Sequence, residues 1–417
     1  MVHLLRVHHE HRGHGHSHES HGLEASFLIL AGLIMRAPIV VLPLYIVQMA
    51  REMNHDPQSF GILTSLPLLM FVLVSMCVPW LVSRINLTRT MQLGSAVIFI
   101  GCLMRMLMTW PTMLVATALV GAGIAILNIS MPTMVSERFS HKPGLYTTAY
   151  SAGMVAGSVI LVMIDPFVTD LFGWKAMMWL MVVMAFIPMF LSFFLPAVTV
   201  STTVEKRSGA KLKFLKDPRT WLFIGMFAGQ SFLSYTLSAW LPSMMNADHV
   251  SETSYTIVNV LFNLAGMPVS LIIPLFIART RRRYHIYLLG TLTAVQIAIV
   301  ALYRWHTEMG EVYWYLFGTI ACLFFTTIFV MALTFYPIKS ATSADTADIS
   351  GISQSLGYLI ASTGPVMYGA MYGTDMPTIS FAWSMAIAVL VTAWCTWQVI
   401  RINKFGLQML GRKKHNS

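Results

Sequence analysis

Two arginines stand inside long apolar stretches of the chain, where a permanent charge is costly and usually has a function. Arg36 lies about eleven residues into the stretch Ala25–Met49, so a rise of about 1.5 Å per residue places it near the middle of a bilayer. Arg105 lies toward the outer end of the stretch Thr90–Met108. Because arginine keeps its charge, each must face a cavity, a partner or an anion. We predict that Arg36 faces a cavity, whereas for Arg105 extension toward the membrane surface is an equal alternative.

The apolar stretches offer few carboxylates that could neutralise Arg36. Asp165 is the only acidic residue in the first six stretches and lies near the outer end of the fifth. Asp345 and Asp348 stand at the inner start of the eleventh. The sequence therefore predicts an unpaired central cation, which suits an anionic or electron-rich solute. The same scarcity argues against a cation pump, which would need acidic ligands.

A glutamine on the seventh stretch matches the depth of Arg36. Gln230 lies about ten residues into its stretch, and helices 1 and 7 occupy equivalent places in transporters built from two parallel repeats. We predict that Gln230 and Arg36 face one central site; the alternative is a hydrogen bond from Gln230 to a neighbouring helix, worth about 1 kcal/mol. Weaker candidates lie on the eighth and eleventh stretches: Asn263, Gln354 and Tyr358. The last two are spaced i, i+4 and share one helical face.

The elements that must position these residues are twelve apolar stretches, each close to the roughly 20 residues that cross a bilayer as a helix. They are Ala25–Met49, Ser59–Val82, Thr90–Met108, Pro111–Met134, Gly144–Val168, Trp174–Leu195, Thr220–Met244, Ser254–Ala278, Tyr284–Tyr303, Val312–Pro337, Ile349–Tyr372 and Thr378–Ile400. A basic segment, Glu205–Arg219, divides them into two sets of six. The predicted domains are a His-rich tail (1–24), a six-helix bundle (25–196), a linker (197–219), a second six-helix bundle (220–401) and a basic tail (402–417).

Basic residues predict the orientation of these helices. If the N-terminus is cytoplasmic, the outer loops hold only Arg51, Lys175 and Arg304, and the inner loops and tails hold nearly all other Lys and Arg. Cytoplasmic loops carry such an excess, so both termini are predicted to lie inside, in a multi-pass protein of the plasma membrane.

Composition excludes other classes of protein. Hydrophobic residues make up 56% of the chain and charged residues 11%, against roughly 25% charged in soluble domains. The net charge of +10 is spread over short loops, so it indicates membrane topology and no nucleic-acid partner. The four cysteines lie inside apolar stretches without a metal-site or disulfide spacing. We expect a lipid bilayer around the chain, a small-molecule cargo, a monomer and no cofactor.

The N-terminal tail carries eight histidines: His3, His8, His9, His11, His14, His16, His18 and His21. Alternating histidines can hold Zn, Ni or Cu weakly. A disordered, solvated tail with incidental metal affinity is the favoured interpretation, because such a tail lacks a fixed ligand geometry. The segment has no apolar core and is not a signal peptide.

Motifs along the chain resemble the cyanate/2-nitroimidazole transporter (CynX/NimT) family of the major facilitator superfamily. They are Arg36 with Pro38, Asn128 and Pro132, Gly144-Leu145-Tyr146-Thr147-Thr148-Ala149, Gln230-Ser231 with Tyr235 and Ala239-Trp240-Leu241-Pro242, and Ser350-Gly351, Gln354-Ser355, Gly357-Tyr358-Leu359, Ala361 and Gly364-Pro365. The resemblance covers nearly everything from the first stretch to the twelfth. It implies an all-α membrane protein with twelve transmembrane helices in two six-helix bundles, the major facilitator fold.

The resemblance implies alternating access, in which two bundles rock about a central site. It implies a small anion or polar nitro-aromatic as cargo and leaves room for proton coupling. The predicted substrate-binding residues are Arg36, Arg105, Gln230, Tyr235, Asn263, Gln354 and Tyr358. The chain departs from the family pattern in two places: the loop Ser83–Arg89 lacks the usual Asp, and the tenth stretch has only Gly318 where the family is glycine-rich.

Other functions stay open at this point. Efflux of an uncharged amphiphile would use Met and aromatic side chains as an adaptable lining. A receptor that does not transport would normally need an attached signalling domain, and the soluble ends are short. An enzyme is less favoured, because no central His/Asp/Glu cluster or nucleophile–base pair is visible. A metal carrier would need its ligands in the membrane, but most histidines lie in the tail.

Overall fold

The computed structural model describes residues 2–55, 59, 61–200, 210–372 and 379–407. The first half of the chain forms α1 (Val2–Val40), η1 (Leu42–Tyr45), α2 (Ile46–Glu52), α3 (Gly61–Ser75), α4 (Val78–Ile85), α5 (Leu87–Met104), η3 (Arg105–Leu107), α6 (Trp110–Arg138), α7 (Pro143–Phe172) and α8 (Lys175–Ser192). The second half forms α9 (Ala210–Leu215), α10 (Pro218–Ala247), α11 (Glu252–Leu264), α12 (Gly266–Arg279), α13 (Arg282–Ala301), η5 (Leu302–Trp305), α14 (His306–Met309), α15 (Glu311–Lys339), α16 (Ser343–Tyr372) and α17 (Ile379–Arg401).

The described helices are long and apolar enough to cross a membrane. Nine qualify by length and hydropathy within the described ranges, and the bent pair α3 and α4 makes a tenth. The two remaining predicted spans fall on α10 and α16, which have 30 residues each and are therefore about 45 Å long. The prediction of an all-α membrane protein is confirmed.

Five of the predicted spans are interrupted. The first breaks at Val41, the second between α3 and α4 with a bend of 54°, the third at Arg105, the eighth at Ala265 and the ninth at Leu302. Backbone groups freed by such breaks need partners inside the protein, because lipid offers none. The breaks therefore mark places where side chains must satisfy the backbone.

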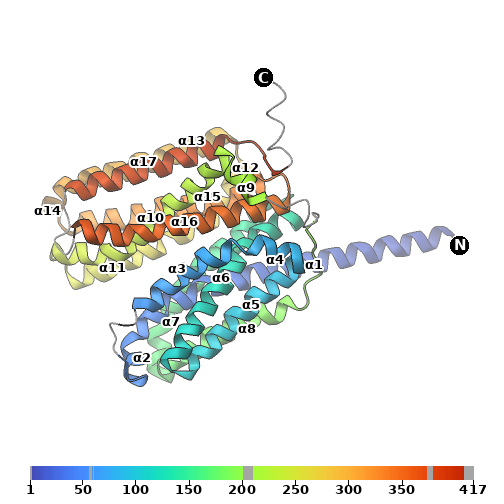
Figure 1. Ribbon diagram of the computed structural model, residues 1–417, viewed down its shortest axis with the longest axis horizontal. Coiled ribbons are helices and arrows are strands. Elements are labelled where there is room, and N and C mark those ends of the chain that lie inside the picture. Colours follow the sequence, from blue (N-terminus) through green and yellow to red (C-terminus); the bar gives the residue numbers. More distant parts are fainter. Residues whose placement is uncertain (1, 56–58, 60, 201–209, 373–378, 408–417) are drawn as a thin grey trace.

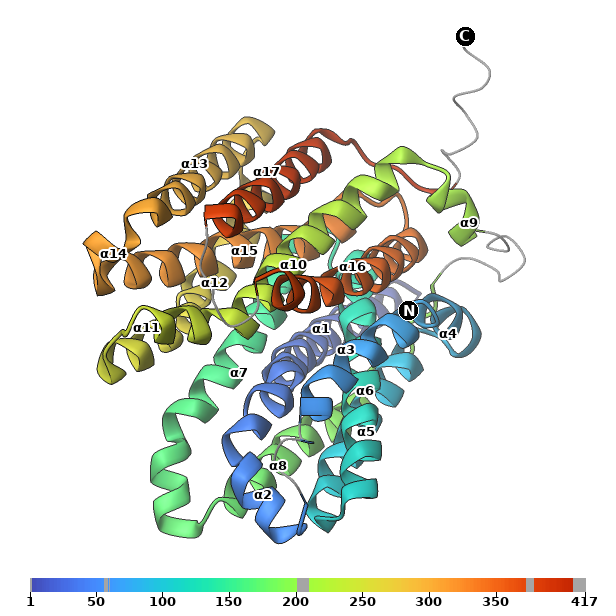
Figure 2. The ribbon, with the colours of Figure 1, turned by 60° about the vertical axis from the view of Figure 1, so that its left-hand side comes forward.

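The two halves meet at one end of the molecule and diverge at the other (Figure 1). We call the meeting end the basic end, because the helix ends and turns there carry Arg84, Arg138, Lys142, Arg279 and Arg401. The opposite end holds α2, the start of α11 and α14 (Figures 1 and 2).

Small residues let the halves approach closely at the basic end. A Cβ on Gly144 of α7 would lie 2.5 Å from the Pro274 oxygen of α12. Gly351 of α16 lies against the backbone of Ser75 in α3, where a Cβ would come within 3.0 Å of the Ser75 oxygen. The hydroxyl of Ser355 donates to the Val72 oxygen at 2.6 Å. All three contacts join the first half of the chain to the second.

A carboxylate adds a polar contact between the halves. Glu137, in the last turn of α6, accepts a hydrogen bond from Ser343 at the first residue of α16. A negative charge near a helix N-terminus is also favoured by the helix dipole. The loop Ser83–Arg89 lacks the usual Asp, and Glu137 supplies an acidic contact to α16.

At the opposite end, the described polar contacts join elements within one half. They include Tyr45 to Asp165 and Lys175 to Glu52 in the first half, and His306 to Asp248 and Ser254 to Glu311 in the second.

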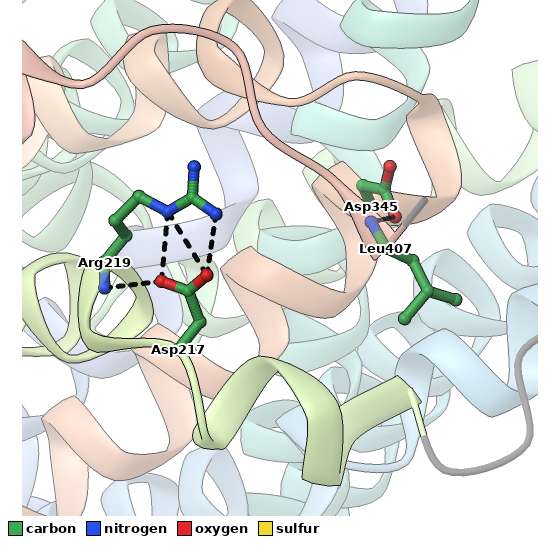
Figure 3. Close-up of polar contacts among 4 residues, drawn as sticks. All are labelled: Asp217, Arg219, Asp345 and Leu407. Atoms are coloured by element: carbon green, nitrogen blue, oxygen red, sulfur yellow. Dashed lines mark hydrogen bonds and ion pairs between the residues drawn. The ribbon is translucent and has the colours of Figure 1, made fainter. Parts of the chain in front are cut away.

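The segment after α17 folds back onto the basic end (Figure 3). The backbone NH of Leu407 donates to Asp345 at 3.2 Å, and Phe405 pairs with the backbone of Lys339 and Ala341 at 2.9 Å. Nearby, Arg219 lies over the Phe405 ring at 4.7 Å and pairs with Asp217 through Nη2 at 2.7 Å. The first residues of the predicted basic tail thus pack against the bundle.

The structure corrects the prediction of a disordered His-rich tail. α1 begins at Val2 and continues without a break into the first span, projecting beyond the bundle (Figure 1). The tail contains no proline, and extending an existing helix requires no new nucleus, so helical continuation is cheap.

Candidate functional site

The candidate site begins with the end of α1. Pro38 lies in the last turn of this helix, and α1 ends at Val40. Proline has no NH to continue the helical hydrogen bonding and its ring crowds the preceding turn. The NH of Val41 still reaches the Ala37 oxygen at 2.9 Å, after which the chain passes into η1. Arg36 therefore stands on the last regular turn before a break.

Arg36 is exposed, whereas the residues beside it are buried. Met35 is 1% exposed and Ala37 is 0% exposed, so the Arg36 side chain lies on the face of α1 that is not packed against the first half. Its charge lies near enough to the second half to act on Tyr235 of α10, Tyr358 of α16 and Cys322 of α15. Among the described residues Arg36 makes no ion pair.

Aromatic rings from both halves gather beside Arg36. The Tyr358 ring lies 5.0 Å from Phe71 of α3, 5.1 Å from Phe227 and 6.2 Å from Tyr235, both of α10. These centroid separations fall in the range of favourable tilted and edge-to-face pairs. We call Phe71, Phe227, Tyr235 and Tyr358 the aromatic group. Phe71, Phe227 and Tyr358 are buried and Tyr235 is half-buried, so the group places a largely covered cluster of rings from both halves beside the cation.

The predicted amides lie around this group with hydrogen bonds of their own. Gln354 is buried and donates to the Asn128 oxygen of α6 at 3.2 Å, across the two halves. Gln230 is buried and donates to the Ser231 hydroxyl at 2.7 Å. Asn263 is exposed on α11 and donates to the Asn259 oxygen of its own helix at 2.9 Å. A role for these amides in cargo binding stays a prediction.

Arg105 is placed apart from the aromatic group. It is 1% exposed, and its Nη1 donates to the Pro38 oxygen at 2.7 Å. Its Nη2 lies 3.4 Å from the Thr117 hydroxyl of α6. The side chain turns into the protein, because the carbonyls at the end of α1 need a donor there. The alternative of extension toward the membrane surface is wrong.

Sequence reasoning missed the residues that complete the arrangement. Phe71, Phe227 and Cys322 are ordinary core residue types within apolar stretches, so nothing in the sequence distinguishes them. The spacing of Gln354 and Tyr358 correctly placed both on the face of α16 that meets the first half.

Metal chemistry has no visible basis within the described ranges. No group of three or more His, Cys, Asp or Glu side chains there could hold a metal ion. The four cysteines are free; Cys77 is exposed and the other three are buried.

Comparison with known proteins gives consistent results. The sequence model described as Major Facilitator Superfamily matches residues 25–365. The chain is 27% identical to the 2-nitroimidazole transporter of Escherichia coli over 325 residues, covering 76% of this chain and 79% of that protein. It is 23% identical to the cyanate transport protein CynX of the same organism over 347 residues, covering 82% and 88%. The solved structure of the proton:xylose symporter XylE matches with a TM-score of 0.72 at 10% identity, covering 93% of this chain and 98% of that one.

Proposed function

Because the chain belongs to the major facilitator superfamily and is a multi-pass membrane transporter, we propose that it carries a small anion or a polar nitro-aromatic solute. The family resemblance predicted from the sequence motifs is confirmed by these relatives. The cargo is not fixed by them, because their identity to this chain is modest. The proposal for the cargo therefore depends on the site.

One observation carries the proposal: Arg36 is an exposed arginine with no ion pair among the described residues, on the last turn of α1, where the sequence predicts mid-membrane depth. A guanidinium presents a planar fork of NH groups that matches two oxygens of one solute group. A nitro group and a carboxylate both offer such an oxygen pair. Binding of an anionic or electron-rich group to Arg36 would offset part of the cost of holding the charge there.

The aromatic group supports a flat cargo. Its four rings come from both halves of the chain, so a ring-shaped solute beside Arg36 would contact α3, α10 and α16 together. Stacked or edge-to-face contacts contribute about 0.5–1.5 kcal/mol beyond area burial. This favours a nitro-aromatic over a small inorganic anion, which has no ring to add to these contacts.

The packing supports an alternating-access cycle. We propose that the bundles 25–196 and 220–401, joined by the linker 197–219, rock about the central site, with the basic end on the cytoplasmic side of the cell membrane. Close contacts at Gly144 and Gly351, and divergence at the opposite end, fit a state that admits cargo from outside. Bound cargo would draw the halves together at the opposite end because it contacts both. Proton coupling and a monomeric state remain part of the proposal.

Uptake into liposomes that contain the purified protein tests this function. The panel is labelled 2-nitroimidazole, labelled imidazole, labelled cyanate and a neutral lipophilic dye. We expect saturable uptake of 2-nitroimidazole and little of imidazole, because only the former has the electron-rich oxygens. Arg36→Gln should abolish this preference, whereas Arg304→Gln, at an exposed arginine of η5, should retain it. Dye transport that is insensitive to Arg36→Gln would favour amphiphile efflux instead.

A further inference from the structure

Arg105 is a buried cation without a carboxylate partner among the described residues. It is 1% exposed, and its Nε has no hydrogen-bond partner there. Its contacts are the Pro38 oxygen at 2.7 Å and the Thr117 hydroxyl at 3.4 Å. A buried, unpaired arginine is costly, so the contact with α1 needs an explanation.

The explanation lies in the end of α1. The last carbonyls of a helix lack helical NH partners, and a cation there is also favoured by the helix dipole. Val41 takes the Ala37 oxygen, so the Pro38 oxygen is the next acceptor along the chain. Arg105, at the junction of α5 and η3, donates a hydrogen bond to this oxygen. A side chain from the end of α5 thus caps the end of α1.

Side-chain packing around this contact is tight. Ala37 and Val41 are fully buried in one cluster with Met113, and Met108, three residues after Arg105, belongs to the same cluster. The carbonyl that Arg105 holds belongs to the second residue after Arg36. A shift of the Pro38 carbonyl would therefore rotate the last turn of α1, which carries Arg36.

We propose that Arg105 is a positioning residue: it caps the carboxyl end of α1 and so fixes the direction in which Arg36 points. It does not contact cargo, because it is buried inside the first half. The expected effect of Arg105 on cargo affinity rests on the proposed function. The expected effect of Arg105 on the geometry of α1 is independent of that function.

The chain offers a matched control for a buried cation at a helix end. Lys339 is 8% exposed and donates to the Ile400 and Ile402 oxygens at the end of α17, at 2.8 and 2.7 Å. It lies at the basic end, remote along α15 from the candidate site. We expect Lys339→Gln and Arg105→Gln each to lower thermal stability. Only Arg105→Gln should change the orientation of the Arg36 side chain.

The first experiment measures the geometry without any cargo. Arg36→Cys is made in a Cys77→Ser background, which removes the exposed native thiol. The rate of labelling by a water-soluble maleimide then reports the exposure of position 36. Adding Arg105→Gln should slow labelling about fivefold, the factor that about 1 kcal/mol of lost positioning produces. Adding Lys339→Gln should leave the rate unchanged.

A second variant keeps the test decisive if Arg105→Gln does not fold. Arg105→Lys retains the charge but cannot hold the Pro38 oxygen and the Thr117 hydroxyl together, because lysine lacks the planar fork. We expect a smaller slowing in the same direction. A labelling rate unchanged in every Arg105 variant that folds would overturn the proposal, as would equal slowing by Lys339→Gln.

The second experiment measures 2-nitroimidazole affinity in a double-mutant cycle. Arg105→Gln should weaken binding roughly tenfold, since misplacement by about 1 Å can cost that much or more. In an Arg36→Gln background it should have little further effect, because the two act as one unit. Additive losses would contradict the positioning role. If Arg36→Gln itself leaves binding unchanged, the proposed function fails while the labelling result still decides the role of Arg105.

Discussion

Gly157 is the residue whose substitution gives the sharpest test of the packing. It lies on α7 against α1, and a Cβ at this position would stand 2.0 Å from the Leu33 oxygen. The next two nearest atoms, the carbonyl carbon and Cα of Leu33, lie at 2.7 and 2.8 Å. All three are backbone atoms, so no side-chain rotation can relieve the overlap. Gly157→Ala must therefore separate the two helices.

The size of the effect follows from the overlap. Ordinary van der Waals contact begins near 3.4 Å, so α1 and α7 must separate by about 1.4 Å. Overpacking of this kind costs about 1–3 kcal/mol, and alanine returns up to about 1 kcal/mol of helix propensity. The upper end of the overpacking range applies because the overlapping atoms are all backbone, so we expect a net loss of about 2 kcal/mol in stability. Leu33 is one turn before Arg36, so cargo affinity should fall as well.

Thermal unfolding of the purified protein in detergent measures this loss. About 2 kcal/mol corresponds to a fall in Tm of roughly 2 °C for a chain of 417 residues. Gly290→Ala on α13 is the matched control, because a Cβ there meets nothing within 4 Å. Its Tm should equal or exceed that of the parent. Equal Tm values for Gly157→Ala and Gly290→Ala would refute the account of how α1 and α7 pack.

Three further predictions concern the membrane topology, the His-rich tail and the basic end. Reporter fusions at Ser208 and Ser417 should both report the cytoplasm, and an external signal from either would overturn the orientation. Deleting His3–His21, most of which projects beyond the bundle although the His21 ring packs 5.4 Å from that of Phe139, should leave uptake within about twofold. Complete loss of uptake that zinc restores would indicate a metal-gated carrier. Glu137→Ala should raise hydrogen exchange at the start of α16 about tenfold, since a charge-assisted hydrogen bond is worth about 1.5–3 kcal/mol; unchanged exchange would show that the Ser343 contact does not hold the halves together.

The spans were predictable because hydropathy determines them. Each predicted stretch coincides with a helix or a broken pair of helices, including those around Arg36 and Tyr358. The breaks were less predictable. Pro38 indicates the end of α1, and Pro79 in the first turn of α4 indicates a break after α3, but neither residue indicates the bend angle of 54°. That angle depends on contacts with other helices.

The site was predictable only in part, because side-chain direction depends on tertiary packing. The unpaired charge of Arg36 could be inferred from the scarcity of acidic residues. On α10, however, the charge of Arg36 acts on Tyr235, about one turn beyond Gln230. Arg105 was ambiguous for the same reason. Its acceptor is a carbonyl 67 positions away, and only the folded chain brings the two together.

The most direct test of the central claim is cargo affinity in Arg36→Gln. A lost charge-assisted hydrogen bond of about 1.5–3 kcal/mol predicts binding that is weaker by about 10- to 100-fold. The measurement is 2-nitroimidazole binding to purified, monodisperse protein, with Arg304→Gln as the control and Arg36→Lys expected to recover only part of the affinity. Near-normal affinity in Arg36→Gln would contradict the account, and helix packing would then be the better explanation of this arginine.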